Sequence, residues 1–241
     1  MIGLFDSGAG GLAALSVLRE GAPRADILYF ADEANLPWGE KTVAALTELA
    51  RAAIARLLSE GACAILSACG TASSVALPVL QGDCPVPLFG ILTPTAEAAA
   101  RAWRGGSILI LGTRATVESG ALAAKIREFA PHAPLLSLPC PDFVPLSEVF
   151  FDTPQDEARR RVRATLAPVL SPDVSVVVLG CTHFSRLGAV IGELFPRASL
   201  VDGAAEAAHA MLAALPKKAL LGAGRTIFRT SGRNPMTYPI R

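Results

Sequence analysis

The sequence Ser67-Ala-Cys-Gly-Thr-Ala-Ser-Ser74 follows a short apolar run, residues 62–66, and a second apolar run, residues 174–179, leads into Gly180-Cys-Thr-His183. Both runs have the length and composition of buried strands, so we expect each cysteine where a strand opens into a loop or a helix. In a parallel α/β sheet, the carboxyl ends of the strands form the edge at which ligands bind. The two stretches therefore predict an α/β fold and a site with a thiol on each side.

A single cysteine at the end of an apolar strand is more often a small core residue than a reactive group. Here each cysteine has a hydroxyl nearby, Thr71 for Cys69 and Thr182 for Cys181, and His183 follows the second cysteine by two residues. Because unpaired polar groups are costly inside a core, this concentration favours a functional site. We therefore take Cys69 and Cys181 as a candidate reactive pair.

The composition describes a compact globular protein without a strong electrostatic field. The chain has 241 residues, of which 51% are hydrophobic and 18% charged, with a net charge of +1. This length fits one large domain or two domains of roughly 100 to 150 residues. The arginine-rich run at 159–163 is expected to be a solvated helix face, so we expect neither a nucleic-acid nor a membrane partner.

Cysteine usage and the start of the chain indicate a cytoplasmic protein. The five cysteines show no framework spacing, which predicts reduced thiols. The first residues lack the basic region of a signal peptide, and no apolar run approaches the ~18 residues of a membrane span.

Strand and helix signals occur in the same order in both halves of the chain. Ile2 corresponds to Ile108 at an offset of about 106 residues, Ile27 to Leu135 at about 108, and Cys69 to Cys181 at 112. The loop at 139–148 then takes the place of the loop at 32–41. We expect strands at 2–5, 26–31, 62–66, 86–92, 107–111, 135–138, 174–179, 199–202 and 226–232, and helices at 12–19, 42–60, 72–80, 117–129, 187–194 and 204–215.

Nearly constant offsets of this kind predict an internal duplication. We therefore expect two similar parallel-sheet α/β domains related by a pseudo-twofold axis, with the active site in the cleft between them. The domain with Cys69 is predicted to comprise residues 1–93 and 204–241, and the domain with Cys181 residues 94–203.

Two opposed thiols suit a reaction that removes a proton from one face of a carbon atom and returns a proton to the other face. The ordinary cysteine pKa of ~8.5 makes both protonation states accessible near neutral pH. Asp6 and His183 could tune these thiols. The substrate would carry an acidic hydrogen beside a carboxylate, and its anionic groups would be held by hydroxyls and backbone amides, at Ser7, Trp38, Gly39, Thr71 and Thr182.

We expect no cofactor and no metal. The pattern Gly8-x-Gly10-x-x-Ala13 matches a dinucleotide fingerprint only formally, because Asp6 and Ser7 stand between the strand and the glycines. Lys41 is the one lysine near a candidate loop, which supports a pyridoxal Schiff base poorly. Cys181-x-His183 lacks further metal ligands at a recognisable spacing.

Six motifs follow one another over nearly the whole chain. They are Ile2-Gly-Leu-Phe-Asp-Ser-Gly-Ala-Gly-Gly-Leu12, Tyr29-Phe-Ala-Asp32 with Pro37-Trp-Gly-Glu-Lys41, Ala68-Cys-Gly-Thr-Ala-Ser73, Phe143-Val-Pro-Leu146, Leu179-Gly-Cys-Thr-His183 and Thr230-Ser-Gly232. In this order they resemble the family of cofactor-independent aspartate and glutamate racemases, specifically the glutamate racemases.

The resemblance implies interconversion of L- and D-glutamate without pyridoxal phosphate or metal, and supply of D-glutamate for peptidoglycan synthesis. It makes Cys69 the acid/base residue for D-glutamate and Cys181 the one for L-glutamate. Asp6, His183 and, close to the place of a further acidic helper, Glu148 would assist them. The implied substrate contacts are Asp6, Ser7, Trp38, Gly39, Gly70, Thr71, Thr182 and His183. The expected partner is a small amino-acid substrate, and the sequence is compatible with a homodimer.

The sequence departs from the family pattern at Gly70, where the family has asparagine, at Trp38, where it has tyrosine, and at Phe184-Ser185, where it usually has tyrosine-proline. A lost hydrogen bond to a charged group costs about 1.5 to 3 kcal/mol. If Gly70 leaves space for the missing amide, Gly70→Asn should raise kcat/KM for glutamate about tenfold. Three alternatives stay open: a glutamate racemase, a related enzyme for another small acid, and a catalytically silent binding or regulatory protein.

Overall fold

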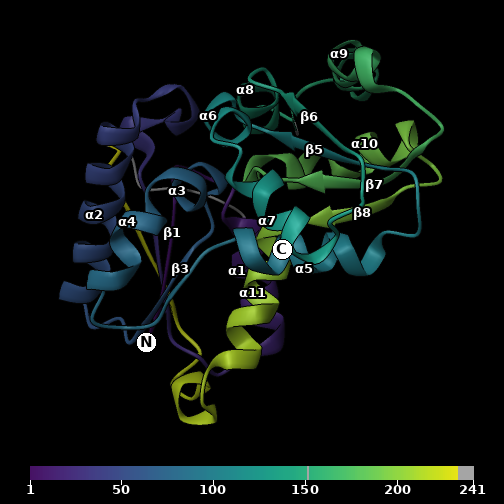
Figure 1. Ribbon diagram of the computed structural model, residues 1–241. Coiled ribbons are helices and arrows are strands. Elements are labelled where there is room, and N and C mark those ends of the chain that lie inside the picture. Colours follow the sequence, from purple (N-terminus) through teal and green to yellow (C-terminus); the bar gives the residue numbers. More distant parts are fainter. Residues whose placement is uncertain (151, 233–241) are drawn as a thin grey trace.

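The computed structural model describes residues 1–150 and 152–232, and these form two parallel sheets (Figure 1). The first sheet has the strand order β4-β3-β1-β2-β9 and the second β6-β5-β7-β8. The strands are β1 (Ile2–Asp6), β2 (Ile27–Ala31), β3 (Ala64–Ser67), β4 (Leu88–Phe89), β5 (Ser107–Gly112), β6 (Leu135–Pro139), β7 (Val174–Leu179), β8 (Ser199–Asp202) and β9 (Thr226–Thr230).

The two sheets repeat one topology. Read from its other edge, the second sheet is β8-β7-β5-β6, which matches β4-β3-β1-β2 strand for strand. All these pairings are parallel, and in the described part of the chain β9 is the one strand without a counterpart. The expectation of two similar parallel-sheet α/β domains is therefore confirmed.

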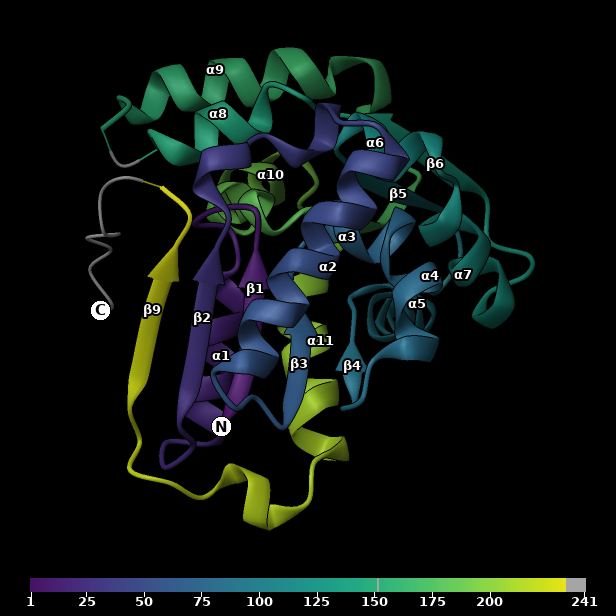
Figure 2. The ribbon, with the colours of Figure 1, turned by 90° about the vertical axis from the view of Figure 1, so that its left-hand side faces the viewer.

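Helices cover both faces of the first sheet (Figure 2). Successive side chains of a strand point to opposite faces. Leu4 therefore packs in the cluster that includes α1 (Leu12–Gly21) and α11 (Gly203–Ala214), and Phe5 packs in the cluster of α2 (Val43–Ser59), α3 (Gly70–Val75) and α4 (Leu77–Leu80). Burial on both faces explains why these strands are continuous apolar runs.

The second sheet is enclosed in the same way. Ile110 packs with α5 (Leu92–Ala102) and α7 (Ala121–Phe129), whereas Leu109 packs on the opposite face. That face is covered by α8 (Phe143–Glu148), α9 (Gln155–Leu166) and α10 (Gly188–Leu194). Within residues 1–150 and 152–232, no helix combines the length and the apolar character needed to cross a membrane.

Several expected elements differ from those observed. The strand expected at 86–92 has only two residues, because Leu92 already begins the alanine-rich helix α5, which the sequence analysis missed. The helix expected at 117–129 is divided into α6 (Arg114–Glu118) and α7, because Gly120 adopts φ of 65°, which a helix does not allow. The loop expected at 139–148 contains α8.

Helix α11 connects the two cores, since it packs against α1 beside the first sheet and against α5 beside the second. The division into residues 1–93 with 204–241 and 94–203 stays a prediction, and residues 233–241 lie outside the described residues.

We predict that Asp202 stabilises α11 as its N-cap. Its Oδ1 accepts hydrogen bonds from the backbone amides of Ala204, at 2.9 Å, and Ala205, at 3.4 Å. Asp202→Ala should lower the free energy of unfolding by about 0.5 to 2 kcal/mol, measured by urea denaturation. Asp202→Asn keeps an acceptor and should lower it much less. Equal losses in the two variants would assign the effect to the charge of Asp202 instead.

Candidate active site

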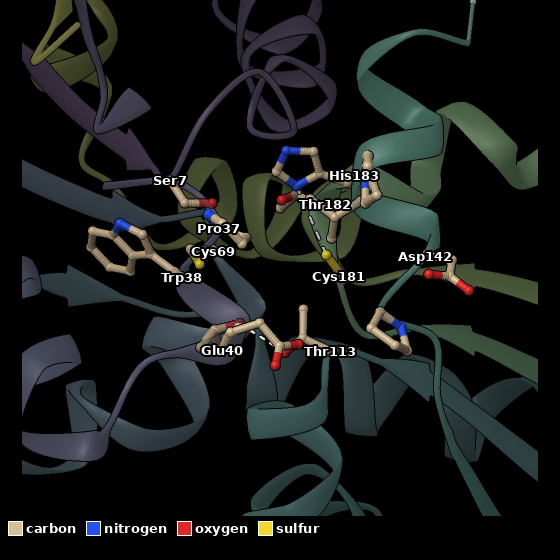
Figure 3. A pocket seen from close by; sticks show the side chains of 15 residues that line it. Ser7, Pro37, Trp38, Glu40, Cys69, Thr113, Asp142, Cys181, Thr182 and His183 are labelled. Atoms are coloured by element: carbon tan, nitrogen blue, oxygen red, sulfur yellow. Dashed lines mark hydrogen bonds between the residues drawn. The ribbon is translucent and has the colours of Figure 1, made fainter. Parts of the chain in front are cut away.

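A pocket of about 230 Å³ opens between the carboxyl ends of the two sheets, with residues from both halves (Figure 3). Every lining residue lies after a strand. The first half contributes Ser7 after β1, Pro37, Trp38, Gly39 and Glu40 after β2, and Cys69 and Thr71 after β3. The second half contributes Thr113 after β5, Pro141, Asp142, Val144 and Pro145 after β6, and Cys181, Thr182 and His183 after β7.

The duplication thus places the two thiols in one cavity. Cys69 follows β3 and Cys181 follows β7, which are equivalent strands of the two sheets. Figure 3 shows the two sulfur atoms on ribbon from different halves of the chain, on either side of the pocket. A ligand in this pocket would therefore have one thiol from each domain beside it.

Most residues expected at the site line this pocket, and a few lie behind it. Those in the lining are Ser7, Trp38, Gly39, Cys69, Thr71, Cys181, Thr182 and His183. Asp6, Gly70 and Glu148 lie outside the lining. Asp6 and Gly70 approach residues of the opposite half, whereas Glu148 contacts His183 of its own half.

Several lining residues were not expected at the site from the sequence, namely Pro37, Glu40, Thr113, Pro141, Asp142, Val144 and Pro145. Thr113 follows Ser7 by 106 residues, the offset that relates Ile2 to Ile108, so the duplication could have identified it. Its hydroxyl lies 2.9 Å from the hydroxyl of Thr71. This hydrogen bond connects the two halves at the pocket.

Asp6 ends β1 and connects its own loop to the opposite half. Its Oδ2 accepts hydrogen bonds from the amides of Gly8, at 3.2 Å, and Gly11, at 3.0 Å, and its Oδ1 accepts one from the hydroxyl of Thr182, at 3.1 Å. The side chain is fully buried. Burial raises the pKa of Asp6 above its ordinary value, while the positive charge of His183 and the two amides oppose that shift.

Cys181, His183 and Glu148 form a row. The Cys181 sulfur lies 3.9 Å from Nδ1 of His183, and Nε2 of the same ring lies 2.8 Å from Oε1 of Glu148. Burial alone would lower the pKa of His183, but the contacts with Cys181 and Glu148 raise it to about 10. Burial works against the Glu148 carboxylate too, yet the hydrogen bond and charge of His183 lower its pKa. At neutral pH the row therefore contains an imidazolium paired with a carboxylate.

Cys69 has a different electrostatic environment. Burial raises the pKa of its thiol well above the ordinary value, and the Asp6 carboxylate raises it further. The backbone amides of Ala72 and Thr71, at the start of α3, act in the opposite direction. The Cys69 side thus favours a protonated thiol, whereas the Cys181 side has a cation beside the sulfur.

Gly70 contradicts the expectation that its missing side chain leaves space. It has no positive φ, and a Cβ atom at this position would overlap the carbonyl oxygen of Gly180 in the opposite half. The glycine allows the loops after β3 and β7 to approach closely. The expected gain in kcat/KM from Gly70→Asn is therefore wrong, and we expect this substitution to lower activity instead.

The described residues contain no group of three or more His, Cys, Asp or Glu side chains that could hold a metal ion. The amides of Gly8 and Gly11, which a dinucleotide phosphate would need, are hydrogen-bonded to Asp6. All five cysteines are free thiols. The hydroxyls of Ser7, Thr71 and Thr113 in the lining suit a small polar ligand.

Fold and pocket define a two-domain α/β protein that presents a buried thiol from each domain to one small cavity. Comparison with known proteins gives the family. Residues 22–211 match the model of the Asp/Glu/hydantoin racemases. The chain belongs to this racemase family, so the expected class of enzyme, an amino-acid racemase, is confirmed.

Individual relatives agree with this assignment. The glutamate racemase of Thermus thermophilus is 40% identical, over 98% of this chain and 89% of that protein. Its crystal structure in complex with β-chloro-D-alanine has a TM-score of 0.84 and covers 96% of this chain and 87% of that one. The Francisella tularensis glutamate racemase in complex with D-glutamate is 26% identical with a TM-score of 0.86, covering 97% and 88% of the two chains.

We predict that Gly70→Asn lowers both stability and activity. The new Cβ must displace the Gly180 backbone, and overpacking of this kind costs about 1 to 3 kcal/mol. The free energy of unfolding from urea titration and kcat/KM should both fall. Gly192→Ala is the matched control, because a Cβ there has no heavy atom within 4 Å and Gly192 lies in helix α10. Gly70→Asn with wild-type stability would show that the two loops separate at no cost.

We predict that the protonated ring of His183 stabilises the folded protein in a pH-dependent way. Folding raises its pKa to about 10, so the protonated ring stabilises the folded state fully below the unfolded pKa of ~6.5, and this contribution is lost as the pH rises through about 10. Glu148→Gln removes the negative partner and should move the titration of His183 to lower pH. NMR of histidine-labelled protein measures this midpoint directly, with the exposed His132 and His209 as internal references. An unchanged midpoint in the variant would contradict the role of Glu148.

Proposed function

We propose that the protein is a glutamate racemase that interconverts L- and D-glutamate with two cysteines and without a cofactor or metal. The observation that carries the proposal is the pair of buried thiols, Cys69 and Cys181, which face one pocket from opposite domains. The relatives named glutamate racemase, and the Francisella tularensis enzyme in complex with D-glutamate, support glutamate as the substrate.

In the proposed reaction, a thiolate on one side takes the proton from the Cα atom of glutamate. The electron pair of the broken C–H bond stays on the substrate as a carbanion, and the thiol on the other side delivers its proton to the opposite face. One thiolate and one thiol have then exchanged protonation states, and the configuration at Cα is inverted. General acid and base catalysis of this kind contributes about 10²- to 10⁴-fold to a rate.

The two thiols would serve as the base in opposite directions of the reaction, Cys181 for L-glutamate and Cys69 for D-glutamate. The His183 imidazolium lies 3.9 Å from the Cys181 sulfur, whereas burial and the Asp6 carboxylate raise the pKa of Cys69 and so favour its protonated form. This resting arrangement suits removal of the proton from L-glutamate by Cys181 and its return by Cys69, which gives D-glutamate. The reverse reaction requires a Cys69 thiolate, which the amides of Thr71 and Ala72 would favour.

The substrate carboxylates and ammonium group would be held by the polar groups of the lining. Hydroxyls of Ser7, Thr71 and Thr113 and backbone amides at Trp38 and Gly39 would donate to the carboxylates. The Thr182 hydroxyl donates to Asp6, so its oxygen would accept a hydrogen bond from the ammonium group. Asp6 and Glu148 do not line the pocket. Asp6 contacts Thr182 and Glu148 contacts His183, and they would assist through these two lining residues. Gly70 would contribute its backbone.

We further propose that the D-glutamate produced supplies peptidoglycan synthesis. The proposal rests on the activity itself, since D-glutamate is the product of the L-to-D direction. A bacterial strain that requires D-glutamate provides the cellular test: the wild-type gene should allow growth without added D-glutamate.

We predict that Cys69→Ala and Cys181→Ala each lower kcat/KM for glutamate racemisation at least about 100-fold while leaving the fold intact. Cys→Ser variants should be nearly as damaging, because a hydroxyl is a much weaker base than a thiol. Circular dichroism follows loss of optical activity, and proton NMR in D2O follows exchange of the Cα hydrogen. Neither alanine variant should support growth of the D-glutamate-requiring strain.

Cys63→Ser is the matched control, because Cys63 is exposed and precedes β3, at the opposite end of the sheet from the pocket. It should keep wild-type activity. A Cys181→Ala protein with full turnover would overturn the two-thiol mechanism. Cα exchange in another small acid, with none in glutamate, would overturn the substrate assignment alone.

A further inference from the structure

We propose that Ser231, which follows the last strand, is a positioning residue for the Trp38 side of the pocket and acts through the buried carboxylate of Asp32. Its kinetic consequence rests on the proposed glutamate racemase activity. Ser231 does not line the pocket, and 193 residues separate it from Trp38 in the sequence.

Strand β9 brings Ser231 to this place. It pairs in parallel with β2 along the edge of the first sheet, with Thr230 opposite Ala31 (Figure 2). The amide of Ser231 then donates to the carbonyl oxygen of Ala31 at 3.1 Å. The residue after β9 therefore lies beside Asp32, the residue after β2, at the pocket end of the sheet.

The hydroxyl of Ser231 has two partners in the loop after β2. It donates to Oδ1 of Asp32 at 2.6 Å and accepts from the amide of Ala34 at 3.0 Å. The other carboxylate oxygen, Oδ2, accepts from the indole Nε1 of Trp38 at 3.1 Å. Asp32 thus connects Ser231 directly to a residue of the pocket lining.

Asp32 depends on these neutral donors. Its side chain is buried, and in the described part of the chain no Lys, Arg or His forms an ion pair with it. A buried carboxylate without hydrogen-bond donors is strongly unfavourable. Without the Ser231 hydroxyl, Oδ1 would keep one donor among residues 1–150 and 152–232, the side-chain amide of Asn35 at 3.0 Å, and the amide of Ala34 would lose the hydroxyl that accepts its hydrogen bond.

The orientation of the indole sets the geometry of this side of the pocket. Trp38 is 1% exposed, and its ring packs against Phe5 with the ring centroids 6.4 Å apart. Trp38 and Gly39 belong to one short 3-10 helix, Trp38–Glu40, so a shift of the indole moves the backbone amides that we expect to bind substrate. Ser231 should therefore affect substrate binding more than proton transfer.

The experiment uses Trp103→Phe protein, in which Trp38 is the sole tryptophan, since the chain has two. In this background, Ser231→Ala should shift Trp38 emission to longer wavelength and increase its quenching by acrylamide. KM for L-glutamate should rise about three- to tenfold with kcat changed less than about twofold. Ser231→Thr keeps the hydroxyl and should restore both readouts.

Asp26→Asn is the control that tests whether a general loosening of β9 would by itself change Trp38 emission or KM. Asp26 binds the other end of this strand, through Arg225 Nη2 at 2.8 Å and the backbone amides of Ala223, at 3.1 Å, and Arg225, at 3.0 Å. This variant should lower the melting temperature but leave Trp38 emission and KM unchanged. Equal changes in Asp26→Asn and Ser231→Ala would overturn the proposal, because general loosening of β9 would then explain both.

Unchanged emission and unchanged KM in Ser231→Ala would overturn it as well. If the wild-type protein does not racemise glutamate, the proposed function fails, while Trp38 emission and quenching still decide whether Ser231 positions the indole. The two failures are therefore distinguishable.

Discussion

The close approach of the loops after β1 and β7 is the contact on which the site depends. Asp6, at the end of β1, accepts a hydrogen bond from the hydroxyl of Thr182 in the other half of the chain. A Cβ atom at Gly10 would overlap that same hydroxyl. Gly70 allows an equally close approach to Gly180. Because both contacts need backbone without side chains, the two domains can close around a small cavity.

Burial of the ionisable side chains determines the electrostatics of the site. Asp6, His183 and Glu148 are ionisable groups that water would otherwise solvate, and here each is stabilised by the others or by backbone amides. The duplicated fold places two thiols at equivalent strand ends, but the residues around them differ. Cys69 has a carboxylate nearby and Cys181 an imidazolium, so one fold repeated twice gives a pocket with two electrostatically different sides.

The two halves also differ in how the remaining sides of the pocket are built. After β2, the chain forms a short 3-10 helix whose Trp38 is held by Asp32 and, through it, by Ser231. After the equivalent strand β6, helix α8 takes this place, and Val144 and Pro145 line the pocket. Among residues 1–150 and 152–232, the extra strand β9 belongs to the first sheet, and its end binds the loop after β2, whereas the second sheet has no such strand.

The sequence by itself determined the parallel strands, their order in two repeated halves, and the location of both thiols at strand ends, because apolar runs and turn residues are local signals. Carboxyl ends of parallel strands meet at one edge of their own sheet, so each cysteine could be placed at such an edge in advance, and the internal duplication predicted that the two edges face one cleft. Tertiary structure decided the rest. The space at Gly70 depends on Gly180, more than 100 residues away, and the role of Ser231 depends on its pairing beside Asp32. Such contacts are set by how the two domains and the last strand pack, which no local pattern of residues encodes.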